Sequence, residues 1–206
     1  ALPEIARKLH ENGKTWVLDP VAAGIGETRT VILESFRDYP PTIVRGNASE
    51  IIALDSVWGL TDTDNTVPTT RPAGVEAVDE VDSAINAAKR IARHLAKRSP
   101  VSAGAVAVSG AVDVVTDGEH VFHLPGGSAM MTKITGAGCS LGGVTATYLA
   151  VAKPLVAAIA ASLLYNRASE IAEAESNGPG SFQVALLDAL WNVTAEQVAA
   201  SEIVID

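Results

Sequence analysis

Residues 135–143 (TGAGCSLGG) bring small residues and the chain's only cysteine, Cys139, to a point where a loop turns into a helix. Glycines let a backbone approach a ligand closely and adopt conformations that other residues avoid. The first turn of a helix offers unpaired N–H groups and the positive end of the helix dipole, which favour anions. A phosphate bound there would lie beside Cys139. A second interpretation is a glycine-rich helix start packed on a strand, with Cys139 as a small buried hydrophobe.

Three more candidates each follow a predicted strand, where ligands bind in open α/β sheets. The first is Asp19, which comes directly after a short apolar run at residues 15–18 and before a small-residue loop at 20–24. A carboxylate in this place can face a metal–phosphate complex. The Asp-Pro pair also favours an ordinary turn, so both interpretations stay open.

The second candidate is the segment from Arg45 to Glu50. Asn47 is a natural N-cap, and Glu50 three residues later would complete a capping box, which explains both residues without a ligand. The capping box does not explain Arg45, which lies at the end of the predicted strand next to a glycine. There it is well placed to bind a phosphate. Glu50 could also hold Mg²⁺ through water, because that ion keeps several waters and takes only one or two carboxylates.

The third candidate is Ser109, whose hydroxyl follows the strand predicted at residues 105–108 and could reach a nucleotide phosphate. Each candidate alone is compatible with a structural role. Together, in βα order and with the loop of Cys139 last, they indicate a phosphoryl-transfer site.

The composition fits one α/β domain over residues 1–206. Hydrophobic residues make up 48% and aromatic residues only 4%, and small aliphatic side chains suit helices packed on a parallel sheet. The net charge of −9 argues against a broad nucleic-acid surface. A single cysteine cannot form an internal disulfide, which predicts a reducing, cytoplasmic setting. No apolar stretch is long enough to span a bilayer, and no signal peptide is recognisable.

Alternating helical and strand patterns predict a doubly wound, mostly parallel sheet flanked by helices. We expect helices at residues 2–11, 28–37, 80–98, 138–151 and 155–175, one opening at 47–50, and a last one from 181. Strands are expected at 15–18, 42–44 and 105–108, in a hairpin of 112–115 with 120–124, and at an edge at 202–206. Residues 55–78, rich in Thr, Asp and Pro, are expected to form a surface excursion.

These segments resemble the hydroxyethylthiazole kinase family of thiamine salvage, within the ribokinase-like superfamily. The matching blocks span nearly the whole chain in the family's order: 17–21 (VLDPV), 43–50 (IVRGNASE), 108–113 (VSGAVD), 131–139 (MTKITGAGC) and 178–182 (GPGSF). The Arg-Gly-Asn and Gly-Ala-Gly-Cys blocks are specific in combination.

The resemblance implies a role for each candidate. Arg45 and Ser109 would contact ATP phosphates, although the family usually has Thr in place of Ser109. Asp19 and Glu50 would position Mg²⁺ and its waters.

The resemblance also implies that Gly136 would lie against the substrate and that residues 136–139 would form an anion hole. Cys139 would give modest assistance as a base, at a position where many ribokinase-like kinases carry Asp. Phosphoryl transfer depends mainly on positioning and charge stabilisation, so modest help suffices.

The family's chains begin earlier, with strands and helices that supply much of the thiazole pocket. The resemblance therefore implies that the N-terminal part of the fold is missing from these 206 residues. Family members are homotrimers with active sites between subunits, so a partner subunit would cover part of the gap.

We therefore expect an ATP- and Mg²⁺-dependent kinase that phosphorylates 4-methyl-5-(2-hydroxyethyl)thiazole. One alternative is another ribokinase-like enzyme, either a different small-alcohol kinase or an ATP-dependent hydrate dehydratase. Another alternative is a non-catalytic remnant that binds nucleotide or serves only in assembly.

Overall fold

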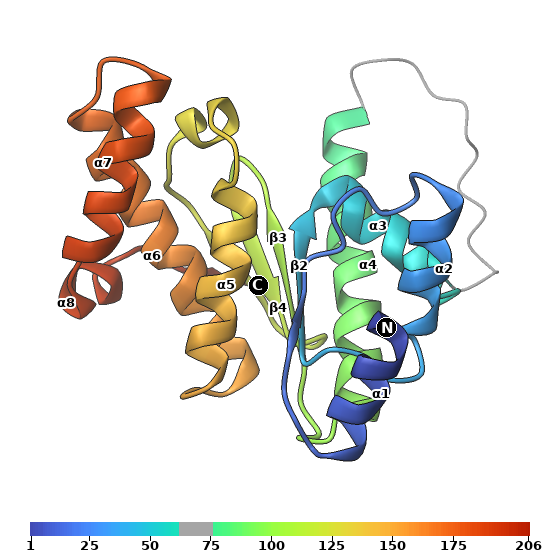
Figure 1. Ribbon diagram of the computed structural model, residues 1–206. Coiled ribbons are helices and arrows are strands. Elements are labelled where there is room, and N and C mark those ends of the chain that lie inside the picture. The colour runs from blue at the N-terminus through green and yellow to red at the C-terminus, as the bar shows by residue number, and fades with distance from the viewer. Residues whose placement is uncertain (62–75) are drawn as a thin grey trace.

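The computed structural model describes residues 1–61 and 76–206, with side chains placed outside 76–82. A central sheet separates two groups of helices (Figure 1). The first group is formed by α1 (Leu2–Glu11), α2 (Glu27–Ser35), α3 (Ala48–Val57) and α4 (Glu76–Arg98). The second is formed by α5 (Ala137–Leu149), α6 (Pro154–Ala174), α7 (Pro179–Asn192) and α8 (Ala195–Ala199), preceded by a 3₁₀ turn at Ala129–Lys133.

The sheet has six strands in the order of the sequence. They are β1 (Val17–Leu18), β2 (Ile43–Asn47), β3 (Ala105–Ser109), β4 (Asp113–Thr116), β5 (Val121–Leu124) and β6 (Val204–Ile205). The first three strands are parallel and the last three continue the sheet antiparallel. The α/β class and the flanking helices are confirmed, while the sheet is more evenly mixed than the sequence predicts. Only residues 110–112 separate β3 from β4, and parallel neighbours need a crossover of a dozen residues or more.

Alternate residues of the inner strands contact opposite helix groups. Val106 and Val108 of β3 pack into the core with α1–α4, while Ala105 and Ala107 pack against α5 and α6. A sheet covered on both faces explains why these strands read as continuous apolar runs. Because helices pack on both faces of the sheet, the ends of its strands are held in place, and so are the residues that follow each strand.

The predicted hairpin at Asp117 and Gly118, and the edge strand near the C-terminus, are confirmed. The expected surface excursion is wrong at both of its ends, since Asp55 belongs to α3 and α4 begins at Glu76. Asp55 is buried because the guanidinium of Arg90 binds its carboxylate, so the helix continues through a residue that looks loop-like in sequence. Residues 62–75 of that expectation lie outside the described part of the chain.

The C-terminal helices also differ slightly from expectation. Pro179 occupies the first turn of α7, a position that tolerates proline because its missing N–H would be unpaired anyway. The helix therefore begins two residues before Ser181, and α8 follows it. No helix in the described ranges is long and apolar enough to cross a membrane.

Candidate functional site

The ends of the three parallel strands bring the candidate residues to one edge of the sheet. Leu18 of β1 pairs with Val44 of β2, so that Asp19 and Arg45, which follow them, lie at neighbouring positions. Farther along, Asn47 of β2 pairs with Ser109, the last residue of β3. The sheet register thus places residues from three separate segments together.

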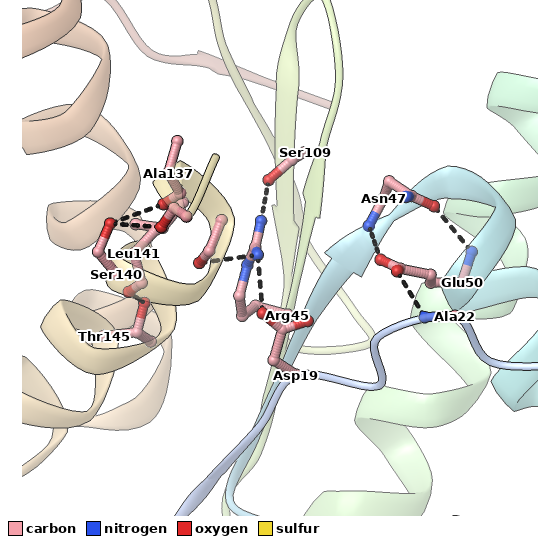
Figure 2. A network of polar contacts seen from close by, with 12 residues as sticks. Asp19, Ala22, Arg45, Asn47, Glu50, Ser109, Ala137, Ser140, Leu141 and Thr145 are labelled. Carbon is pink, nitrogen blue, oxygen red and sulfur yellow. Dashed lines mark hydrogen bonds and ion pairs between the residues drawn. The ribbon is translucent and has the colours of Figure 1, made fainter. Parts of the chain in front are cut away.

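Arg45 is the centre of a polar network at this edge (Figure 2). Its Nη1 donates to Oδ2 of Asp19 and to the carbonyl of Gly138, both at 3.1 Å, and its Nη2 donates to Oγ of Ser109 at 2.6 Å. The Arg45 side chain is only 8% exposed. Its Nε is buried and has no hydrogen-bond partner among the described residues. One guanidinium therefore joins β1, β2, β3 and the first turn of α5.

The start of α5 lies against the ion pair of Arg45 and Asp19. A Cβ on Gly138 would lie 3.0 Å from Nη1 of Arg45, so a side chain at residue 138 would crowd the guanidinium. Gly136, the N-cap, has φ of +91°, a left-handed conformation that side chains disfavour. The expectation of a loop that turns tightly into a helix at residues 136–139 is confirmed.

The first turn of α5 exposes Cys139 to solvent. The interpretation of Cys139 as a buried hydrophobe is therefore wrong. The neighbouring Ser140 turns its hydroxyl back to the carbonyl groups of Gly136 and Ala137, at 2.9 and 3.0 Å. Backbone N–H groups of a first helical turn have no partner within the helix, so the exposed end of α5 can accept an anion.

Glu50 lies apart from the Arg45 network, at the junction of β2 and α3 (Figure 2). Its Oε2 accepts the N–H of Asn47 at 2.9 Å, and Oδ1 of Asn47 accepts the N–H of Glu50 at 2.9 Å. The capping box is confirmed. Oε1 of Glu50 also accepts the N–H of Ala22 at 3.0 Å, which ties the loop after β1 to α3.

The donor set fits a magnesium ion held mainly by water and phosphate. Within residues 1–61 and 83–206, no group of three or more His, Cys, Asp or Glu side chains could hold a metal ion. One oxygen of Asp19 faces Arg45, and both oxygens of Glu50 accept backbone N–H groups. Carboxylates that accept these hydrogen bonds still have lone pairs that can bind the waters of an ion. Mg²⁺ needs only one or two carboxylates.

Two buried groups near Arg45 played no part in the sequence-based assignment. Burial raises the pKa of Asp113, the first residue of β4, against the opposing effects of the Gly110 N–H, the charge of Arg45 and the Asn166 side chain. Burial likewise raises the pKa of Tyr165 on α6, partly offset by a hydrogen bond with Ser140 and by Arg45. Asp113 belongs to the sequence block 108–113 and accepts a local hydrogen bond from the N–H of Gly110, but its interactions with Arg45 and Asn166 join distant segments.

The chain matches known proteins over nearly its whole length. The model of the hydroxyethylthiazole kinase family matches residues 1–196. A hydroxyethylthiazole kinase of Bifidobacterium adolescentis is 87% identical over 204 residues, which cover 99% of this chain and 69% of that protein. One from Bifidobacterium longum subsp. infantis is 66% identical over 213 residues, covering 100% of this chain and 68% of the relative.

Solved structures agree with this assignment. A hydroxyethylthiazole kinase from Pyrococcus horikoshii OT3 superposes with a TM-score of 0.81 at 28% identity, covering 100% of this chain and 70% of that one. A pyridoxal kinase from Staphylococcus aureus, at 18% identity and a TM-score of 0.53, shares the fold over 100% of this chain and 69% of its own. The fold is thus that of ribokinase-like kinases, and this chain belongs to the hydroxyethylthiazole kinase family.

Proposed function

We propose that this protein transfers the γ-phosphoryl group of ATP to the hydroxyl of 4-methyl-5-(2-hydroxyethyl)thiazole, a reaction of thiamine salvage. One observation carries the proposal beyond family membership. Arg45 joins Asp19, Ser109 and Gly138 at the carboxyl ends of the parallel strands and at the start of α5. A cation, a carboxylate, a hydroxyl and a helix N-terminus suit the positioning and charge stabilisation on which phosphoryl transfer depends.

Arg45 and Ser109 bind the ATP phosphates in this proposal. The guanidinium presents a rigid fork of donors, which matches phosphate oxygens in pairs. Its position is set before nucleotide arrives by the Ser109 hydroxyl on one side and the Asp19 carboxylate on the other. Such prior fixing lowers the cost of ordering the side chain when ATP binds.

Asp19 and Glu50 position Mg²⁺ through its waters. The ion, when bound, would neutralise charge on the phosphate oxygens. Asp19 also keeps Arg45 in place, so its carboxylate has two partners of positive charge. Glu50 holds the loop after β1 through Ala22, and this contact fixes the approach of Asp19 to the site.

The loop from Gly136 to Cys139 receives the reacting groups. Gly136 lies against the substrate, and the backbone N–H groups that begin α5 stabilise negative charge on the transferred phosphoryl group. Sγ of Cys139, as the thiolate, takes the hydroxyl proton and becomes the thiol while the alcohol oxygen forms its bond to the γ-phosphorus. The bond from that phosphorus to the bridging oxygen breaks, and ADP leaves.

We also propose a homotrimer with its active sites between subunits, formed by a single domain per chain and working in the cytoplasm. A site of this kind binds small-molecule substrates. The net charge of −9 argues against a nucleic-acid partner.

The decisive experiment incubates the purified protein with ATP, Mg²⁺ and the thiazole alcohol, and detects phosphorylated thiazole by mass spectrometry. Arg45→Ala should abolish the product. Arg167→Ala is a matched control, because that arginine forms a half-exposed pair with Glu170 on α6 and should leave the product unchanged. Formation of ADP without phosphorylated thiazole would redirect the proposal to another acceptor, and the absence of both would contradict it.

A further inference from the structure

Asp113 is a buried carboxylate directly behind the proposed nucleotide contacts. It begins β4 and is only 9% exposed. Its Oδ1 accepts the N–H of Gly110 at 3.0 Å. A charged group is costly to bury unless it is compensated, so a carboxylate in this place needs specific partners. They are the Gly110 N–H, the positive charge of Arg45 and the Asn166 side chain, all of which favour its charged form.

The hydrogen bond to Gly110 closes the turn that carries Ser109. Residues 110–112 connect β3 to β4, and the turn is tight, since a Cβ on Gly110 would lie 3.2 Å from the carbonyl oxygen of Val112. Ser109 immediately precedes the amide that Asp113 holds. Fixing that amide therefore fixes the backbone from which the Ser109 hydroxyl reaches Nη2 of Arg45, at 2.6 Å.

Asp113 and Asp19 act on Arg45 from different strands. Asp19 follows β1 and contacts the guanidinium at 3.1 Å. Asp113 begins β4, beyond β3, and interacts with the same charge without a direct hydrogen bond. The geometry gives the two carboxylates different tasks, because Asp19 touches the phosphate-binding cation while Asp113 touches the backbone next to the phosphate-binding hydroxyl.

We propose that Asp113 is a positioning residue for nucleotide binding, which holds the Gly110 N–H and thereby directs the Ser109 hydroxyl and Arg45 toward the phosphates. This inference rests on the proposed function, because it takes Ser109 and Arg45 as the nucleotide contacts. Asp113 itself touches neither ATP nor the alcohol.

Two substitutions separate the acceptor from the carboxylate charge. Asp113→Val removes the acceptor and suits a buried strand, while Asp113→Asn keeps one acceptor oxygen for the Gly110 N–H. Loss of a hydrogen bond to a charged group changes an equilibrium constant by about tenfold or more. We expect Asp113→Val to raise KM for ATP and Kd for ADP at least about tenfold, with kcat and KM for the alcohol changed less than about threefold. Asp113→Asn should stay within about threefold of the wild type in both nucleotide constants.

Asp117→Val is the matched control at the other end of the same hairpin. Oδ1 of Asp117 accepts the N–H groups of Glu119 and His120 at 2.9 Å, so this variant also loses a carboxylate that holds a turn. It should lower the melting temperature without changing Kd for ADP. A merely structural role for Asp113 would make the two Val variants alike in ADP binding.

Calorimetric titration with ADP measures binding independently of turnover. An unchanged Kd in folded Asp113→Val overturns the inference, and so does an Asp113→Asn protein as impaired as Asp113→Val. If Asp113→Val does not fold, Asp113→Ser, which is too short to reach Gly110 in the same way, takes its place with the same expected loss. A wild-type protein that binds ADP but phosphorylates no thiazole alcohol contradicts the proposed function alone, whereas one that does not bind ADP overturns both.

Discussion

Asp19 and Glu50 both follow the ends of neighbouring parallel strands, yet their surroundings differ. Asp19 faces the guanidinium of Arg45, which also contacts a serine hydroxyl and the carbonyl of Gly138. Glu50 faces two backbone N–H groups, those of Asn47 and Ala22. Asp19 thus pairs with a charged side chain, whereas Glu50 accepts hydrogen bonds from backbone N–H groups.

This difference distinguishes a side chain that stabilises the fold, such as Glu50, from one that contributes little to its stability, such as Arg45. A capping box satisfies N–H groups that a helix start leaves unpaired, so Glu50 stabilises the chain whether or not a ligand binds. Arg45 is almost completely buried, its Nε has no partner among the described residues, and a buried ion pair such as that of Arg45 with Asp19 is weak evidence for a role in stability. Under the proposed function, substitutions at Arg45 should lower activity, and substitutions at Glu50 should lower stability.

Arg45→Ala should have the largest effect, and the effect should fall on activity. Loss of a donor preorganised for phosphate costs about 10²–10³ in rate, so we expect at least a hundredfold fall in kcat/KM for ATP. Arg45→Lys keeps a positive charge beside Asp19 but cannot donate to Asp19, Gly138 and Ser109 together, so an intermediate loss of about tenfold or more is expected.

Steady-state kinetics with varied ATP, with circular dichroism to confirm folding, checks this expectation. A folded Arg45→Ala protein with wild-type kcat/KM would remove the contrast between the two carboxylates, because Arg45 would then serve the fold alone.

Glu50→Ala should have a smaller effect, and it should fall on stability. It removes acceptors for two backbone N–H groups, so we expect a loss of about 2 kcal/mol in the free energy of unfolding, measured by urea denaturation. Ser49→Ala is the control, since its exposed hydroxyl bonds only Asn47 and its loss should cost less than about 0.5 kcal/mol.

Glu50→Gln sharpens the test of the proposed magnesium role. It keeps one acceptor oxygen and removes the charge, so a rise in the Mg²⁺ concentration needed for half-maximal rate would reveal a role beyond capping. An unfolding midpoint of Glu50→Ala equal to that of the wild type would contradict the structural assignment.

The contrast also explains which features the sequence reveals. The capping box depends on residues three apart, so Asn47 and Glu50 show it directly. The contact of Arg45 with Gly138 joins residues 93 apart, and only the folded sheet places them together. Asp55 looks like part of a loop because its partner Arg90 lies 35 residues away. The interactions of Asp113 with Arg45 and Asn166 are long-range as well, although its hydrogen bond with Gly110 is local. Residue types predicted the candidate residues, and long-range pairing decides which of them lie together.

Cys139→Asp should preserve or raise turnover. An aspartate carboxylate can accept the alcohol proton in place of the Cys139 thiolate, and Cys139 is exposed, so the change has little effect on packing. Full general-base catalysis is worth about 10²–10⁴, and a modest role predicts a fall within about tenfold for Cys139→Ser. Single-turnover kinetics isolates the chemical step from product release. Complete loss of turnover in a folded Cys139→Asp protein would contradict a simple base role.

The smallest effect concerns pH, where the two ends of one hairpin should behave oppositely. Burial raises the pKa of Asp113, so its contribution to stability is complete below the ordinary aspartate pKa of about 3.9 and is lost as pH rises through the folded-state pKa. Burial also acts to raise the pKa of Asp117, but hydrogen bonds from the backbone N–H groups of His120 and Glu119 and from the His120 side chain outweigh it and lower the pKa. Its contribution is therefore present above about 3.9 and is lost as pH falls through the folded-state pKa.

Urea unfolding between about pH 3 and pH 7 measures both contributions by difference from the wild type. Relative to Asp113→Asn, the wild type should lose stability as pH rises, and relative to Asp117→Asn it should gain stability. Ionisation of Asp113 thus weakens the fold, whereas ionisation of Asp117 strengthens it. Differences of the same sign for both variants would assign Asp113 to the residues that serve only the fold. The candidate site would then end at Ser109 and would not include the start of β4.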